Sequence, residues 1–167
     1  MKKLLVLGLA LLTTVAFAKD NTGKIGIGYQ GDIAGNNLIN SSTKYGDWSV
    51  KYGVSSNLTV QAIIGFNAID AADALNVGAR VLYDVVEQEN SDFYVGAGAI
   101  YSSAGSDVSA VRISVPLGFE WSFAGLPEIG FSAEAGLAID LNTSTGADQT
   151  DLSTVGGGLG VGIHYYF

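Results

Sequence analysis

The sequence predicts an all-β chain whose eight antiparallel strands close into an up-and-down barrel. In eight segments, apolar residues alternate with small or polar ones, and turn-rich stretches separate the segments. Alternation with a period of two is typical of strands, because successive side chains point to opposite faces of a sheet. The segments span residues 24–30, 46–53, 58–67, 75–84, 92–102, 108–122, 128–140 and 153–167.

The connections between these segments differ at the two ends of the predicted barrel. Short connections follow the second, fourth and sixth segments, whereas longer or more polar ones follow the odd segments. Short turns at one end and longer loops at the other are the plan of bacterial outer-membrane barrels. The short connections are 54–57, 85–91 and 123–127, and the longer ones are 31–45, 68–74, 104–107 and 141–152.

The two faces of the predicted strands differ sharply in charge. One face is apolar throughout and carries no charged residue, as in the alternation of Leu159, Val161 and Ile163 with glycines. A charge facing lipid at mid-depth costs about 2–4 kcal/mol. The segregation therefore predicts a transmembrane barrel with the apolar face outside. The charges within the strands lie on the opposite face, at Asp47, Lys51, Arg80, Arg112, Glu120 and Glu134.

Aromatic residues gather toward both ends of the apolar face. Girdles of this kind mark the two membrane interfaces of outer-membrane barrels. The alternative is a soluble lipocalin-like barrel with this face inside, but so many rings would crowd the narrow interior of eight strands. The short-turn end carries Tyr52, Tyr83, Phe93, Phe119, Trp121, Phe131, Tyr165 and Phe167, and the long-loop end carries Tyr29, Trp48, Phe66 and Tyr101.

The start of the chain has the pattern of a cleaved signal peptide. Lys2 and Lys3 precede an apolar run, and Ala16-Phe17-Ala18 gives an Ala-x-Ala cleavage site. A retained anchor helix is the alternative, although the apolar run is short for a membrane span. We therefore expect a signal peptide at 1–18, cleaved after Ala18, and a barrel domain at 19–167.

Charge and cysteine content exclude several classes of function. The chain has 8 basic and 16 acidic residues, so loss of Lys2 and Lys3 leaves 6 against 16, a formal net charge of −10. A chain this acidic, with no basic patch, should not bind nucleic acid. With no cysteine in the chain, disulfides, thiolate metal sites and a cysteine nucleophile are all excluded.

The chain resembles the small eight-stranded outer-membrane barrels of Gram-negative bacteria, the OmpA/OmpX-like group with the outer membrane protein beta-barrel domain. The resemblance spans nearly all of residues 22–167 and is carried by the hairpin Ser49–Val60, by Val115–Trp121 and by Glu134–Gly136. The terminal Tyr165-Tyr166-Phe167 is similar to the aromatic signal that the outer-membrane insertion machinery reads, with Phe167 as the assembly signal. The resemblance implies an outer-membrane location and heat-modifiable gel mobility.

The inner face suggests a lumen filled by side chains. Lys51, Arg80 and Arg112 can meet Asp47, Glu120 and Glu134 across it, because buried charges need partners. The structural interpretation is a salt-bridge plug and the functional one is a narrow gated pore; the small interior of eight strands favours the plug. Glycines of the first and last strands form a bare wall, into which we expect Arg80, Arg112 and Tyr94 to lean from the opposite side.

No catalytic, cofactor or metal site is expected. His164, the single histidine of the chain, lies on the inner face near the short-turn end, away from the outer surface where lipid-modifying barrel enzymes act. The stretch Asp140–Asp151 shares oxygen ligands with a calcium loop, but its glycine is at position seven and its last ligand is Asp. A solvated acidic loop is therefore the preferred interpretation of 140–151, with a cation site as the alternative.

The expected function is that of a structural or surface-interaction scaffold. Its partners would be outer-membrane lipid and lipopolysaccharide, the insertion machinery through the C-terminal strand, and a host or neighbouring cell surface through loops 31–45 and 141–152. We expect a monomer. A low-conductance pore for small solutes is the main alternative, and a lipid-modifying enzyme is disfavoured by the absence of a His/Ser/acid cluster.

Overall fold

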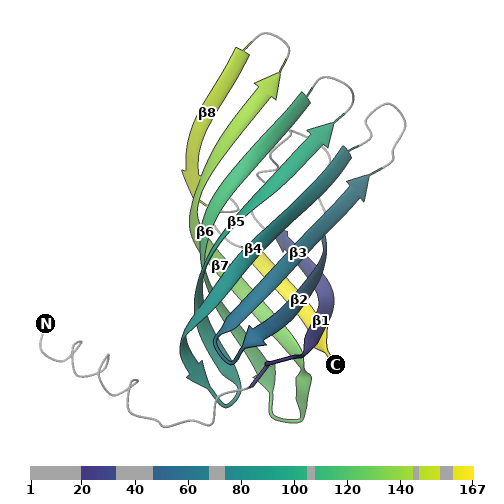
Figure 1. Cartoon of the computed structure of the whole chain (residues 1–167), viewed down its shortest axis with the longest axis vertical. Coiled ribbons are helices and arrows are strands. Elements are labelled where there is room, and N and C mark those ends of the chain that lie inside the picture. Colours follow the sequence, from purple (N-terminus) through teal and green to yellow (C-terminus); the bar gives the residue numbers. More distant parts are fainter. Residues whose placement is uncertain (1–19, 33–46, 68–73, 105–107, 145–146, 155–159) are drawn as a thin grey trace, which may run out of the picture.

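The computed structural model describes residues 20–32, 47–67, 74–104, 108–144, 147–154 and 160–167. All regular structure in these residues is β-strand (Figure 1). No helix in this part of the chain is long and apolar enough to span a membrane. The strands are β1 (Ile25–Asp32), β2 (Asp47–Ser55), β3 (Leu58–Asn67), β4 (Ala74–Gln88), β5 (Ser91–Ala104), β6 (Val108–Phe123), β7 (Leu126–Ser144), β8 (Ala147–Thr154) and β9 (Gly160–Tyr166).

The strands form a closed antiparallel barrel. Strands β1 to β7 pair in chain order, and β9 pairs with β7 on one side and with β1 on the other. Because β8 continues along the upper half of β7 while β9 pairs with its lower half, the two together occupy the eighth position of the ring. The predicted eight-stranded antiparallel barrel is confirmed.

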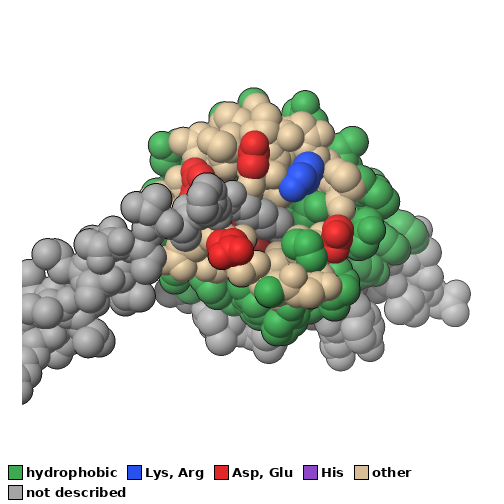
Figure 2. All heavy atoms as spheres, turned by 90° about the horizontal axis from the view of Figure 1, so that it is seen from below, with side chains coloured by type: hydrophobic (Ala, Val, Ile, Leu, Met, Phe, Trp, Pro, Cys, Tyr) green, Lys and Arg blue, Asp and Glu red, His purple; other side chains and the backbone are tan. Residues whose placement is uncertain are grey.

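Burial in the barrel is the reverse of that in a water-soluble protein. Apolar side chains on the outer face are exposed, as for Leu117 at 59% and Leu137 at 59%, whereas charged side chains on the inner face are buried, as for Lys51 at 2%. Seen from the short-turn end, hydrophobic side chains surround a polar and charged centre (Figure 2). The apolar face therefore points outward, opposite to the lipocalin alternative.

Aromatic rings lie on the outer face at both ends of the barrel. Tyr29 and Trp48 are neighbours toward the long-loop end, with ring centroids 4.8 Å apart. At the short-turn end the rings of β5, β6 and β7 stack in a row, which leaves them only half-exposed. Their centroid distances are 4.6 Å for Phe93–Phe119, 5.6 Å for Phe119–Trp121 and 5.8 Å for Trp121–Phe131.

The prediction of a loop at 141–152 is wrong. Strand β7 runs on to Ser144 and β8 begins at Ala147, so most of this stretch is a hairpin with paired backbones (Figure 1). Its polar sequence lacks the alternating apolar residues that indicate a strand. A hairpin that projects beyond the apolar band of the barrel does not need an apolar face. The rest of the expected loop 31–45 beyond Asp32, together with the signal peptide at 1–18, lies outside the described residues.

Candidate functional site

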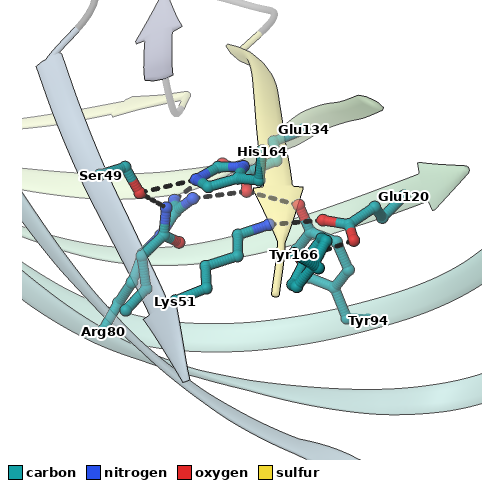
Figure 3. Close-up of polar contacts among 9 residues, drawn as sticks. Ser49, Lys51, Arg80, Tyr94, Glu120, Glu134, His164 and Tyr166 are labelled. Carbon is teal, nitrogen blue, oxygen red and sulfur yellow. Dashed lines mark hydrogen bonds and ion pairs between the residues drawn. The ribbon is translucent and has the colours of Figure 1, made fainter. Parts of the chain in front are cut away.

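The candidate site is a cluster of polar side chains inside the barrel, called here the lumen network. It holds two buried carboxylates, and each is bound by one cation and one tyrosine hydroxyl (Figure 3). Inward-facing positions of seven different strands supply its members, so only closure of the barrel brings them together. The members are Ser49, Lys51, Gln61, Arg80, Tyr94, Glu120, Glu134, His164 and Tyr166.

Glu134 on β7 forms the first half of the network with Arg80 on β4. The two guanidinium nitrogens Nη1 and Nη2 donate to Oε2 and Oε1 of Glu134, both at 2.7 Å. The hydroxyl of Tyr94 on β5 donates to Oε1 at 2.5 Å. Since β4 and β7 are not neighbours in the ring, this bidentate ion pair ties opposite walls together.

Glu120 on β6 forms the second half with Lys51 on β2. The ammonium Nζ of Lys51 lies 2.5 Å from Oε2 of Glu120. The hydroxyl of Tyr166 on β9 donates to the other carboxylate oxygen at 2.7 Å. Lys51 also lies over the ring of Tyr94, 5.9 Å from its centroid, so a cation–π contact joins the two halves.

A chain of neutral side chains extends the network to His164. Arg80 Nε donates to Gln61 Oε1 at 2.6 Å, and Gln61 Nε2 donates to Ser49 Oγ at 2.5 Å. Ser49 Oγ lies 2.8 Å from His164 Nε2. The direction of the Ser49–His164 hydrogen bond depends on the tautomer of the imidazole. His164 is fully buried and bonded to Ser49 inside this network.

Two of the predicted lumen charges lie outside the network. Arg112 forms two hydrogen bonds of 2.7 and 2.8 Å with Asp140 on the neighbouring strand. Asp47 accepts from Asn76 Nδ2 at 3.2 and 3.4 Å. Both pairs sit nearer the long-loop end than the network, since Arg112 and Asp47 pair at the upper parts of their strands.

The interpretation of 140–151 as a loop is also corrected, because β7 and β8 pair over most of it. Asp140 belongs to β7 and its carboxylate binds Arg112, so the first oxygen ligand of a calcium loop is already engaged. No group of three or more potential metal-ligating side chains occurs in the described part of the chain.

Glycines make room for the large side chains of the lumen, but not as the sequence suggested. The ring of Tyr166 lies against Gly26 and Gly130 on the two neighbouring strands, and the ring of Tyr94 lies against Gly118. A β-carbon at Gly118 would be 2.1 Å from the Tyr94 ring. Tyr166 of the last strand itself thus fills the space at Gly26. Arg80 and Tyr94 cross the lumen to Glu134, the cross-strand partner of Gly160 on β9, and Arg112 binds Asp140.

Register explains why sequence reasoning missed part of the network. Lys51, Gln61 and Arg80 are direct cross-strand partners on β2, β3 and β4, and Ser49 lies two residues before Lys51 on the same face. Gln61 and Ser49 carry no charge, so the segregation of charge in the sequence does not mark them as lumen residues. Tyr166 also shows the inward parity that places it in the lumen, opposite to its neighbours Tyr165 and Phe167.

Fold and lumen together define a class. A closed eight-stranded barrel with an apolar outer face and an ionic lumen has the OmpA-like outer-membrane barrel fold. The chain is similar to the crystal structure of the N-terminal β-barrel domain of Pseudomonas aeruginosa OprF, with 15% identity and a TM-score of 0.51. The match covers 87% of this chain and 98% of that chain. At 15% sequence identity, this structural similarity shows the fold alone.

Searches by sequence add no relative. Neither a protein-family model nor a curated protein matches the chain.

Proposed function

We propose that this protein is an integral outer-membrane barrel that acts as a scaffold with a lumen closed by side chains. The observation that carries the proposal is the inversion of burial: apolar residues cover the outside while Lys51, Arg80, Glu120 and Glu134 are buried and bonded inside. In water such an outer face would be a large aggregation hazard, whereas in a bilayer it is the surface that lipid covers. The OprF-like fold supports the same location.

The scaffold would present its hairpins to partners on the long-loop side. Strands β4 to β7 have 14 to 19 residues, more than the 9 to 11 or so that a tilted strand needs to cross a bilayer. Hairpins such as β7–β8 would thus project from the membrane. We propose lipid and lipopolysaccharide as the partners of the wall, the insertion machinery as the partner of the C-terminal strand, and another cell surface as the partner of the hairpins. We propose that this role involves no enzymatic activity.

Conductance in planar bilayers tests the closed lumen. Protein refolded in lipid should give no conductance steps, because the two ion pairs and their tyrosines block the interior. A shift in gel mobility on boiling, measured on the same sample, would show that the barrel is folded. Steady unitary steps from folded protein would overturn the closed lumen and favour the low-conductance pore.

Cell fractionation and lipid analysis test the rest of the proposal. The mature chain should sediment with the outer membrane and should start at Lys19. Lipid A should have the same mass with and without expression of the protein; a mass change that requires the folded barrel would favour the enzyme alternative.

A further inference from the structure

The segment before β1 is folded into a defined turn. Residues 20–24, called here the N-terminal strap, turn back on themselves with a hydrogen bond of 3.0 Å from Lys24 N to Asn21 O. Gly23 has a φ of 76°, the left-handed value that the third residue of a type II turn requires. Asp20 Oδ1 accepts from Thr22 N at 2.9 Å and fixes the entry to the turn.

The strap is fastened to the end of β2 at Gly53. Gly23 N donates to Gly53 O at 2.8 Å, and Gly53 N donates to Lys24 O at 3.1 Å. A β-carbon at Gly53 would lie 1.9 Å from the carbonyl oxygen of Asn21, and its other nearest neighbours are also strap atoms. The missing side chain at Gly53 therefore provides the space in which the strap sits.

A small, partly open cavity is lined in part by the strap. Its volume is about 20 Å³, and Asn21 lines it together with Lys51, Thr59, Tyr94, Glu120 and Tyr166. A space of this size holds one water molecule. Asn21 of the strap thus lines the same cavity as both partners of the Lys51–Glu120 ion pair.

We propose that the N-terminal strap is a stopper that closes the short-turn mouth of the lumen and keeps bulk water away from the lumen network. Ion pairs are stronger where water is excluded, so a seated strap strengthens the bond between Lys51 and Glu120. The strap is held by its own turn and by two hydrogen bonds to Gly53 of β2, just beyond Ile25–Tyr52, the last residue pair between β1 and β2. It can therefore open while the barrel stays folded.

Thiol labelling tests the stopper, since the chain has no cysteine of its own. Thr59→Cys places a thiol on the wall of the cavity, and protein refolded in detergent micelles is treated with a charged methanethiosulfonate reagent. Labelling should be slow with the strap in place. Adding Gly53→Ala should speed it roughly tenfold, the factor that about 1.4 kcal/mol in an opening equilibrium produces.

A second strap variant and a matched control keep the test decisive. Gly23→Val strains the turn without touching the barrel, because a β-carbon at Gly23 has no atom within 4 Å. It should also speed labelling, including if Gly53→Ala does not fold. Gly125→Ala makes the same change at another short-turn glycine with open space around it and should leave the rate unchanged. Fast labelling of Thr59→Cys alone, or equal rates in folded strap variants and control, would overturn the stopper.

Discussion

Arg80 and Glu134 lie 54 residues apart in the chain and are joined by two parallel hydrogen bonds of 2.7 Å across the lumen. Both side chains are more than nine-tenths buried. Burying two charges costs desolvation free energy, which a bidentate geometry and the further bonds from Tyr94 and Gln61 offset. This pair is thus a strut between non-adjacent strands, and its loss should affect the whole barrel.

Removing one member of this strut should be costly. Arg80→Met leaves the Glu134 carboxylate buried without its cation, and we expect the free energy of unfolding in lipid vesicles to fall by about 3–5 kcal/mol. The double variant Arg80→Met/Glu134→Gln should recover much of that loss, because no uncompensated charge remains. Urea titration followed by tryptophan fluorescence measures both. The control is Glu128→Gln, an exposed change at the short-turn end, which should alter the free energy of unfolding by at most about 0.5 kcal/mol. An equally small effect of Arg80→Met would contradict a stabilising role for the Arg80–Glu134 pair.

The two neighbouring tyrosines of the last strand should respond differently to loss of their hydroxyl. Tyr166→Phe removes a hydrogen bond to the buried Glu120 carboxylate, and we expect a loss of about 1.5–3 kcal/mol. Tyr165→Phe is the matched control, because its ring faces outward and is 48% exposed. Equal effects in the same unfolding assay would show that the Tyr166 hydroxyl adds nothing to the network.

Gly118 should not tolerate a methyl group while Tyr94 is present. The added β-carbon would be 2.1 Å from the Tyr94 ring, so Gly118→Ala should cost about 1–3 kcal/mol by overpacking. In a Tyr94→Leu background the same change should cost much less, since the ring is gone. A double-mutant cycle measures this coupling, and strict additivity would contradict the close contact.

A charge introduced on the outer face should destabilise the barrel by an amount that depends on its depth in the membrane. Val81 lies within the apolar band, whereas Val85 lies beyond Tyr83 toward the short turn. In vesicles, Val81→Arg should destabilise by about 2–4 kcal/mol and Val85→Arg by at most about 1 kcal/mol. The same replacement at two exposed valines makes the comparison a direct one. Indifference at Val81 would indicate that water, not lipid, covers this face.

The sequence by itself determined the class of fold and the direction of each face. Strand parity is local: Ile27, Trp48 and Val50 show which way their strands face without knowledge of any partner. The same parity put Lys51, Arg80, Glu120 and Glu134 inside. It failed at 141–152, where backbone pairing alone makes the β7–β8 hairpin and no apolar pattern marks it.

Only the tertiary structure decided which inward-facing side chains meet. Arg112 binds Asp140 and Asp47 binds Asn76, although the sequence offered both for the central cluster. The offset in register between successive strands sets the position of each residue along the barrel axis. That offset depends on all the strand pairings of the closed barrel at once. The same holds for the strap, because Asn21 and Gly53 have no recognisable relation in the sequence until β1 and β2 are paired. Local alternation thus determined inside and outside, and barrel closure determined the contacts.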